Sequence, residues 1–181
     1  MAALLTAAVA LLLALAKRSL NSKSAAVAAR VATLGYGIPG TVLAVGVFVP
    51  VAWLDNYLVE WLRLPEGSAI LKGTLLVMLL AYVIRFLAVA YSANEAGLER
   101  IGRQQEETAR SLGVTGFALL RRVHLPLLKG ALGTAMLMVF VDVMKEMPIT
   151  LMTRPYNWDT LATRVYTFTT EGQYTFAALP S

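Results

Sequence analysis

The sequence predicts an all-α integral membrane protein: a bundle of membrane-spanning helices with one structured cytoplasmic loop. Hydrophobic residues make up 57% of the 181-residue chain and charged residues only 15%, whereas soluble domains carry about 25% charged residues. The apolar residues form long blocks, and the basic residues stand at the ends of those blocks. We therefore interpret residues 1–181 as a single transmembrane domain.

Residues 2–16 form the first apolar block. A comfortable bilayer crossing needs about 20 residues, so this block is short. A signal peptide would carry its positive charges ahead of the apolar core, but Lys17 and Arg18 follow it. We interpret the block as the end of a spanning helix whose beginning is missing.

Three further spans are predicted, at residues 31–53, 70–93 and 127–150. The first of them contains no charged residue, and as a helix it would extend about 34 Å, enough for the hydrocarbon core. Trp53, at its end, is placed where interfacial aromatic residues are expected.

The loops fix the orientation. Residues 17–30 and 94–126 together hold nine Lys and Arg, whereas residues 54–69 hold one. The positive-inside rule therefore places both basic loops in the cytoplasm. The net charge of +5 does not indicate nucleic-acid binding, because the basic residues form no mixed basic and aromatic patch. No cysteine is present, so a disulfide or thiolate metal site is excluded.

Two glycine patterns resemble nucleotide-binding motifs. Residues 35–40 fit G-x-G-x-x-G, but they lie in an apolar run with Pro39, which indicates close helix approach and a bend instead. After Gly97, the positions that should hold Lys and Ser or Thr are Arg103 and Gln104. We expect no nucleotide, cofactor or metal site in this chain.

The cytoplasmic loop 94–126 is the most informative stretch. Apolar or uncharged side chains recur at helical spacing, at Leu98, Ile101, Gln105, Ala109 and Leu112. Gly113 can end that helix, Thr115 can cap a short second helix over residues 116–124, and Pro126 suits the first turn of the next span. Periodicity alone fits a solvated helix at the headgroups as well as a protein-docking element. The lone histidine, His124, is interpreted as a polar position on the short helix.

The residues of this loop resemble a known motif. Glu107-Thr108-Ala109, three residues, Gly113, nine residues, Val123, one residue and Leu125-Pro126 resembles the EAA loop of binding-protein-dependent ABC transporter permeases. There the pattern is Glu-Ala-Ala, three, Gly, nine, Ile, one, Leu-Pro. The resemblance implies a type I importer fold and a coupling helix that fits a groove on an ATPase subunit. It assigns ATPase coupling to Glu107, Thr108, Ala109, Gly113, Phe117, Val123, Leu125 and Pro126.

A second resemblance lies further on. Lys145-Glu146-Met147-Pro148 and residues 154–166 resemble the KELP and R-P-x-N-x-D-T-L-A-T-R-V-Y segments of ferric-iron importer permeases, in particular the carboxy-terminal half of a fused permease. Permeases for thiamine or phosphonates remain an alternative. In the family the last span begins near residues 177–181, so we predict a domain truncated at both ends with its final span missing.

The resemblance also implies partners and a location. These are a dimer of ABC ATPase subunits that binds ATP and Mg²⁺, a periplasmic or lipoprotein substrate-binding protein, a second permease half or an identical permease, and the lipid bilayer. The expected location is a bacterial or archaeal cytoplasmic membrane. The chain itself is not expected to be an enzyme, since no H-E-x-x-H or G-x-S-x-G motif occurs.

Several charged residues fall within or near predicted spans. Asp142, Lys145 and Glu146 lie near one helix face, just before Pro148, and Arg85 lies deep in the preceding span. They are either interface charges, with Arg85 snorkelling, or groups that line a water-filled path or a subunit interface. An ion-coupled carrier that used them as a relay is a lesser alternative, because inverted repeats, which favour such carriers, are not visible.

Overall fold

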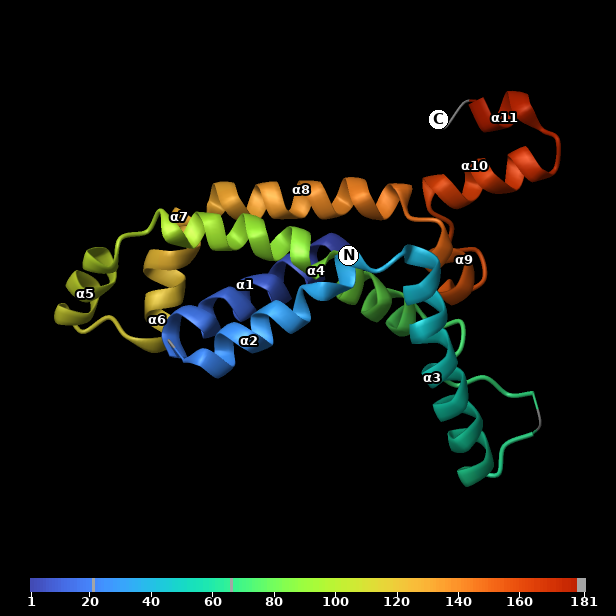
Figure 1. Cartoon of the computed structure of the whole chain (residues 1–181), viewed down its shortest axis with the longest axis horizontal. Helices are drawn as coiled ribbons and strands as arrows, with labels where there is room; N and C mark the ends of the chain where they lie inside the picture. The colour runs from blue at the N-terminus through green and yellow to red at the C-terminus, as the bar shows by residue number, and fades with distance from the viewer. Residues whose placement is uncertain (21, 66, 179–181) are drawn as a thin grey trace.

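The structure is a computed structural model that describes residues 1–20, 22–65 and 67–178. Within these ranges all regular elements are helical and no strand occurs, which confirms the predicted fold class (Figure 1). The elements are α1 (Ala2–Leu20), α2 (Lys23–Ala32), the 3₁₀ turn η1 (Leu34–Gly37), α3 (Gly40–Trp61), α4 (Leu75–Glu99), α5 (Arg103–Ser111), α6 (Gly116–Leu119), the π-helical turn η2 (Leu120–His124), α7 (Leu125–Leu127), α8 (Lys129–Lys145), α9 (Pro148–Thr153), α10 (Leu161–Thr170) and α11 (Tyr174–Ala178). Residue 66, in the predicted outer loop, and residues 179–181, near the expected start of the last span, lie outside the described residues.

Three helices are long and apolar enough to cross a membrane: α1, α3 and α4. Residues 116–127 and α8 meet that criterion only together, as a pair bent by 73°. The bounds differ from those expected. Helix α1 continues to Leu20, α4 runs from Leu75 to Glu99, and α8 ends at Lys145.

The span predicted at residues 31–53 is broken. Helix α2 ends at Ala32, and α3 begins only at Gly40. Ile38 is extended, with φ −84° and ψ 135°, because the ring of the following Pro39 disfavours helical backbone in the residue before it. The absence of charge identified an apolar segment but could not reveal this interruption.

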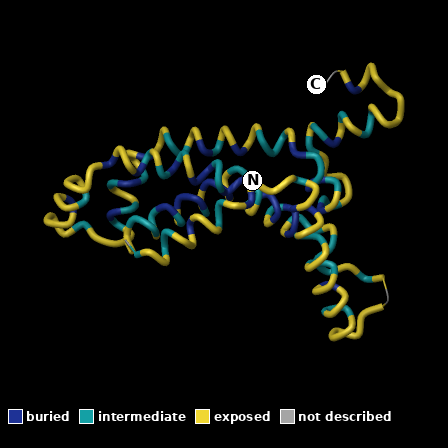
Figure 2. Tube along the Cα trace, viewed as in Figure 1, coloured by how far each residue is buried: buried dark blue, intermediate teal, exposed yellow. Residues whose placement is uncertain are grey.

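The core lies where α1, α4 and α8 run side by side (Figures 1 and 2). Alanines at the contacts are fully buried: Ala10 on α1, Ala81 and Ala90 on α4, and Ala135 on α8. Such small residues let apolar helices approach closely. At Gly97 the approach is tighter still, since a Cβ there would lie 2.4 Å from the Cβ of Ala131.

Helix α3 leaves this bundle at a steep angle (Figure 1). It buries little and exposes apolar side chains along much of its length, among them Val42, Val49 and Trp53. Its buried Asp55 accepts hydrogen bonds from the backbone N–H groups of Ile70 and Leu71. The following loop is thereby tied back to the helix.

Candidate functional site

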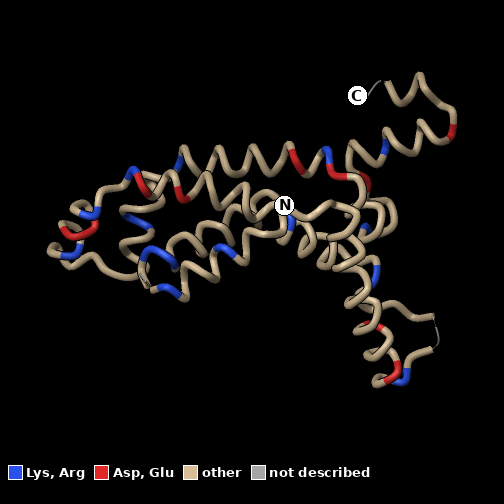
Figure 3. The backbone as a smooth tube through the Cα atoms, in the orientation of Figure 1, with Lys and Arg blue, Asp and Glu red and all other residues tan. Residues whose placement is uncertain are grey.

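The predicted coupling segment, residues 107–126, lies within the loop 94–126 at one end of the bundle. This loop contains the last residues of α4 and then the short helices α5 and α6, followed by η2 and α7. Lys and Arg gather at this end, on α5, near α6 and at the turn between α1 and α2 (Figure 3). Helix α5 ends at Ser111. Gly113, two residues later, has φ +77° and terminates the helix as expected. The N–H of Gly113 donates to the carbonyl of Arg110, and the N–H of Val114 donates to that of Ala109, both at 2.9 Å. These two bonds form a Schellman motif.

The second helix differs from the expected helix over residues 116–124. It is one α-helical turn, α6, followed by the π-helical turn η2. Thr115 stands at the N-cap position, but its hydroxyl makes no capping hydrogen bond. Pro126 was expected in the first turn of the next span, but it lies in the three-residue helix α7, which a bend of 73° separates from α8. The π turn inserts a residue into the helical register, and sequence periodicity does not reveal such an insertion.

The large apolar side chains of this loop differ in exposure. Phe117 is 75% exposed in the segment between α5 and the start of α6, residues 112–117, which we call the tip of the loop. Leu120 and Val123 are half-buried. On the first helix, Ala109 is buried, but Leu112 is 77% exposed. Two large apolar side chains therefore face outward at the end of the molecule that carries the basic loops.

The eight predicted coupling residues differ in their exposure to solvent. Ala109 is buried, Val123 and Leu125 are half-buried, and Glu107, Thr108, Gly113, Phe117 and Pro126 are exposed. The hydroxyl of Thr108 donates to the carbonyl of Gln104 at 2.8 Å within α5. The exposed members form a surface that a partner could contact, while Ala109 anchors α5.

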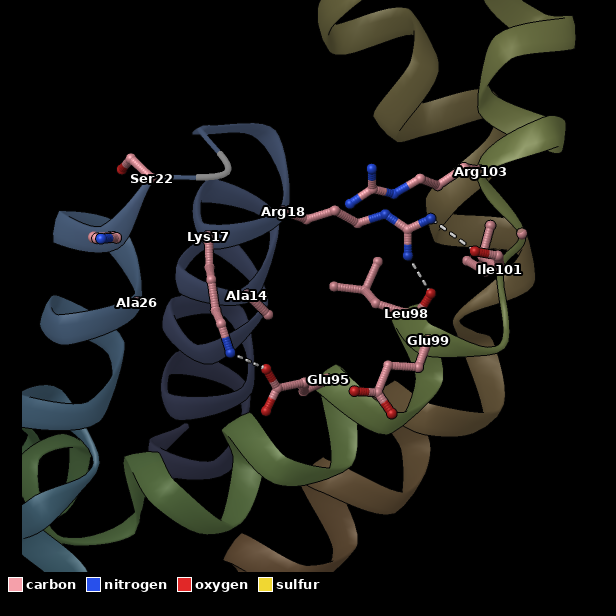
Figure 4. A pocket seen from close by; sticks show the side chains of 12 residues that line it. Ala14, Lys17, Arg18, Ser22, Ala26, Glu95, Leu98, Glu99, Ile101 and Arg103 are labelled. Carbon is pink, nitrogen blue, oxygen red and sulfur yellow. Dashed lines mark hydrogen bonds and ion pairs between the residues drawn. The ribbon is translucent and has the colours of Figure 1, made fainter.

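A cluster of half-buried Arg18 and Glu106 with buried His124 holds this segment to the bundle. Arg18, at the end of α1, lies with its Nε 2.7 Å from Glu106 Oε1, and His124 Nε2 is 3.7 Å from the same oxygen. The Arg18 guanidinium also donates to the carbonyls of Leu98 and Ile101 (Figure 4). One arginine thus joins the end of α4, the start of α5 and the end of α1.

The roles of Arg18 and Glu106 could not be predicted from the sequence. Arg18 counted only toward the basic loop, and Glu106 adjoins the motif residue Glu107 without belonging to the pattern. Burial lowers the pKa of His124 below its ordinary value; Arg18 and Arg110 act in the same direction and Glu106 opposes them. The neutral form of His124 is therefore favoured in the fold.

A second group of predicted residues surrounds the break between α2 and α3. Arg85 Nη1 donates to the carbonyls of Gly35, at 3.3 Å, and Tyr36, at 3.2 Å, and to that of Ile38. Its guanidinium carbon lies 5.6 Å from the centre of the Tyr36 ring. Non-helical backbone at membrane depth needs such internal donors, because lipid supplies none.

Glu146 lies on the other side of the same break. Its Oε1 accepts a hydrogen bond from the Ile149 N–H at 3.3 Å, and the same oxygen would be 3.1 Å from a Cβ on Gly40. A carboxylate at the first residue of α3 interacts favourably with the positive end of the helix dipole. Arg85 therefore satisfies carbonyls before the break, and Glu146 stabilises the helix that begins after it.

The other two predicted charges, Asp142 and Lys145, do not join this group. Asp142 is half-buried and Lys145 is exposed, whereas Glu146 is buried. Within the described ranges, Lys145 forms no ion pair with either acid. Pro148 begins α9, and its Cγ would be 3.7 Å from a Cβ on Gly40.

The second resembling segment, residues 154–166, forms a compact link after α9. Asp159 pairs with Arg154, and its other oxygen lies 3.5 Å from Arg164 Nε. Thr160 caps α10 through a capping box with Thr163, and its hydroxyl donates to the carbonyl of Glu146 at 3.2 Å. This segment fixes α10 against the end of α8. Across the described residues, no three His, Asp or Glu side chains cluster in a way that could hold a metal ion.

Membrane-length helices, a broken apolar segment and a helical loop at the basic end together are typical of an all-helical membrane protein. The chain belongs to the family described as the binding-protein-dependent transport system inner membrane component, which matches residues 7–180. The chain is thus assigned to the ABC permease family, in agreement with the resemblance seen in the sequence.

Two curated relatives are similar over 107 residues, or 59% of this chain. The Fe(3+)-transport system permease protein FbpB 2 of Haemophilus influenzae is 32% identical there, over 21% of its own length. The protein named 2-aminoethylphosphonate transport system permease protein PhnV of Salmonella typhimurium is 33% identical, over 40% of its length. The chain therefore spans well under two thirds of each relative.

Proposed function

We propose that this chain is a permease subunit of an ATP-driven importer and that a separate ATPase dimer, which binds ATP and Mg²⁺, drives it. The carrying observation is the loop itself: Leu112 and Phe117 are largely exposed on a helix pair that buried residues fix to the bundle. An exposed apolar tip at the cytoplasmic end suits a groove on a partner. No step of catalysis is assigned to this chain.

The contacts suggest how movement of the ATPase would reach the spans. Movement of α6 would be transmitted through η2 and α7 to α8. Leu128, at the bend between α7 and α8, is fully buried. The ion pair of Glu106 with Arg18 would transmit the same movement to α1. Packed interiors transmit displacement because they compress little, so α1, α4 and α8 would move together.

The region around the break is our candidate for the translocation path. Discontinuous helices lie at the substrate pathway in many transporters, and here Arg85 and Glu146 hold the two ends of the interruption. Both are positioning residues for the backbone between Ile38 and Gly40. The exposed apolar side chains of α3 offer a surface for a second permease half or for lipid.

For the cargo we propose ferric iron, delivered by a periplasmic or lipoprotein binding protein. The KELP-like segment and the relative named for Fe(3+) transport support this choice. A phosphonate is the second candidate, because the relative named for 2-aminoethylphosphonate transport is equally similar.

Uptake into proteoliposomes tests the proposal. The full-length protein would be reconstituted with its ATPase and binding protein, and radiolabelled ferric iron, 2-aminoethylphosphonate and thiamine offered in parallel. We expect iron uptake that requires ATP hydrolysis. Phosphonate or thiamine uptake would retain the ATP-driven permease and replace the cargo. Uptake that follows a proton gradient and ignores ATP would refute the mechanism.

A further inference from the structure

A cavity of about 610 Å³ opens between the ends of α1, α2 and α4 (Figure 4). Its volume falls in the range of small-ligand sites, about 300–1,000 Å³. Apolar side chains, including Ala14, Ala26 and Leu98, line part of it. The rest of the lining carries four basic and two acidic side chains: Lys17, Arg18, Lys23, Arg103, Glu95 and Glu99.

Two of the basic groups already have partners. Lys17 Nζ lies 2.5 Å from Glu95 Oε1, and Arg18 pairs with Glu106. Lys23 and Arg103 are exposed and form no ion pair or hydrogen bond through their side chains in the described part of the chain. Glu99 is the one lining acid that is likewise unpaired among the described residues. The free charge at the cavity is therefore net positive.

The position of the cavity limits its ligand. It lies where α1 and α4 end in the basic loops, at the cytoplasmic level of the headgroups. Ser22 and Lys23, in the first turn of α2, border it, and the N–H end of a helix adds positive partial charge. Basic cavities between spans on this side favour anionic headgroups. A free phosphate would leave the apolar part of the lining uncovered.

We propose that this cavity binds the headgroup of an anionic phospholipid from the cytoplasmic leaflet. Lys23 and Arg103 supply the unpaired positive charge for the headgroup, and the glycerol and upper acyl chain cover the apolar lining. Arg103 is the first residue of α5, so the bound lipid links α2 to α5. The site requires only the membrane orientation and is independent of the cargo.

Native mass spectrometry of the full-length protein tests the site, with phosphatidylglycerol and phosphatidylcholine added in equal amounts. We expect retention of phosphatidylglycerol. The double variant Lys23→Gln/Arg103→Gln should weaken that retention by roughly fivefold or more for each charge removed, and Lys23→Arg/Arg103→Lys should preserve it. The matched control is Arg121→Gln/Arg122→Gln, which removes two exposed charges outside the cavity.

Each other outcome overturns the inference. Equal retention of the two lipids, or equal loss in both Gln double variants, would mean that no defined site exists. Displacement of phosphatidylglycerol by inorganic phosphate at similar concentration would identify a free-anion site instead. Thermal unfolding of every variant verifies that the fold is unchanged. Transport is not measured, so failure here is separate from failure of the importer proposal.

Discussion

Single small residues allow the backbone between α2 and α3 to lie close to α4. Gly35 is buried against α4, and a Cβ at this position would lie 2.1 Å from the carbonyl oxygen of Ile84. That atom belongs to helix backbone and cannot move alone. Gly37, two residues on, would meet nothing within 4 Å.

We therefore expect Gly35→Ala to lower thermal stability in detergent clearly, whereas Gly37→Ala should change it little. The reason is that the added methyl must displace either η1 or α4, and tight cores lose about 1–3 kcal/mol on such overpacking. Differential scanning fluorimetry of both variants provides the measurement. Equal melting temperatures would argue against the close approach.

Arg85 gives a second prediction at this scale. Arg85→Met keeps much of the apolar stem but leaves the carbonyls of Gly35, Tyr36 and Ile38 without their donor. Of these residues Gly35 is buried, whereas Tyr36 and Ile38 are exposed. A buried group left without a partner costs about 1–3 kcal/mol, so the free energy of unfolding should fall by about that amount. Arg122→Met, at an exposed position, is the control in the same denaturation experiment. A relay role for Arg85 would instead leave stability unchanged.

At the scale of elements, the coupling loop shows how far sequence reasoning reached. Gly113 was interpreted correctly because local backbone rules decide its conformation. Pro39 indicated a bend, but the sequence did not reveal that the whole of residues 33–39 would leave the α-helix. The π turn η2 and the bend after α7 were not foreseen either, since neither leaves a periodic signal.

The turn at Gly113 can be tested directly. With φ +77°, a β-branched residue there costs roughly 1–2 kcal/mol in the left-handed region, so Gly113→Val should reorient α6. We expect unchanged membrane insertion, loss of transport and weaker ATPase binding in a pull-down. Gly102→Val is the control, because Gly102 has φ −61° and ψ 143°, which valine adopts easily. Unchanged ATPase association in Gly113→Val would contradict the coupling role.

The same element should respond to pH through His124. Its pKa in the fold is lowered from 6.5, first by burial, so the unfolded loop binds the proton more readily. Stability from the neutral ring is complete above about pH 6.5 and is lost as the pH falls through the lowered folded pKa. Arg18, Arg110 and Glu106 are the charged groups acting on the ring.

Proteolysis of the loop across this range measures the effect. We expect faster cleavage between α5 and α6 as the solution is acidified. His124 is the only histidine in the chain, so His124→Gln should flatten the profile. A wild-type profile that is already flat would show that protonation of His124 does not affect the loop.

At the scale of the whole molecule, the sequence predicted the class of fold but not its long-range contacts. Blocks of apolar residues and the distribution of basic residues were sufficient for an all-helical membrane protein. The pairing of Arg18 with the α4 end and with Glu106 joins segments about 80 residues apart. Such pairs have no local signature, because only the folded packing brings the partners together.

The exposed tip of the loop lies far from α9 and α10, which are at the opposite end of the molecule (Figure 1). Large apolar side chains are exposed at both ends: Phe117 at the tip and Tyr156 before α10, 75% and 92% exposed. Neither contributes much to the core, so Phe117→Ser and Tyr156→Ser should both leave stability nearly unchanged. Their effects on partner binding should differ.

Buried aromatic anchors cost about 2 kcal/mol or more when truncated in an interface, which corresponds to roughly thirtyfold in affinity. If the ATPase docks at the tip, Phe117→Ser should weaken ATPase binding by about that factor and Tyr156→Ser should have no effect. Surface plasmon resonance with immobilised ATPase compares the two variants under one condition. Equal affinities would show that the ATPase does not contact Phe117 on α6. Movement of the ATPase would then have to reach α8 from another part of the loop.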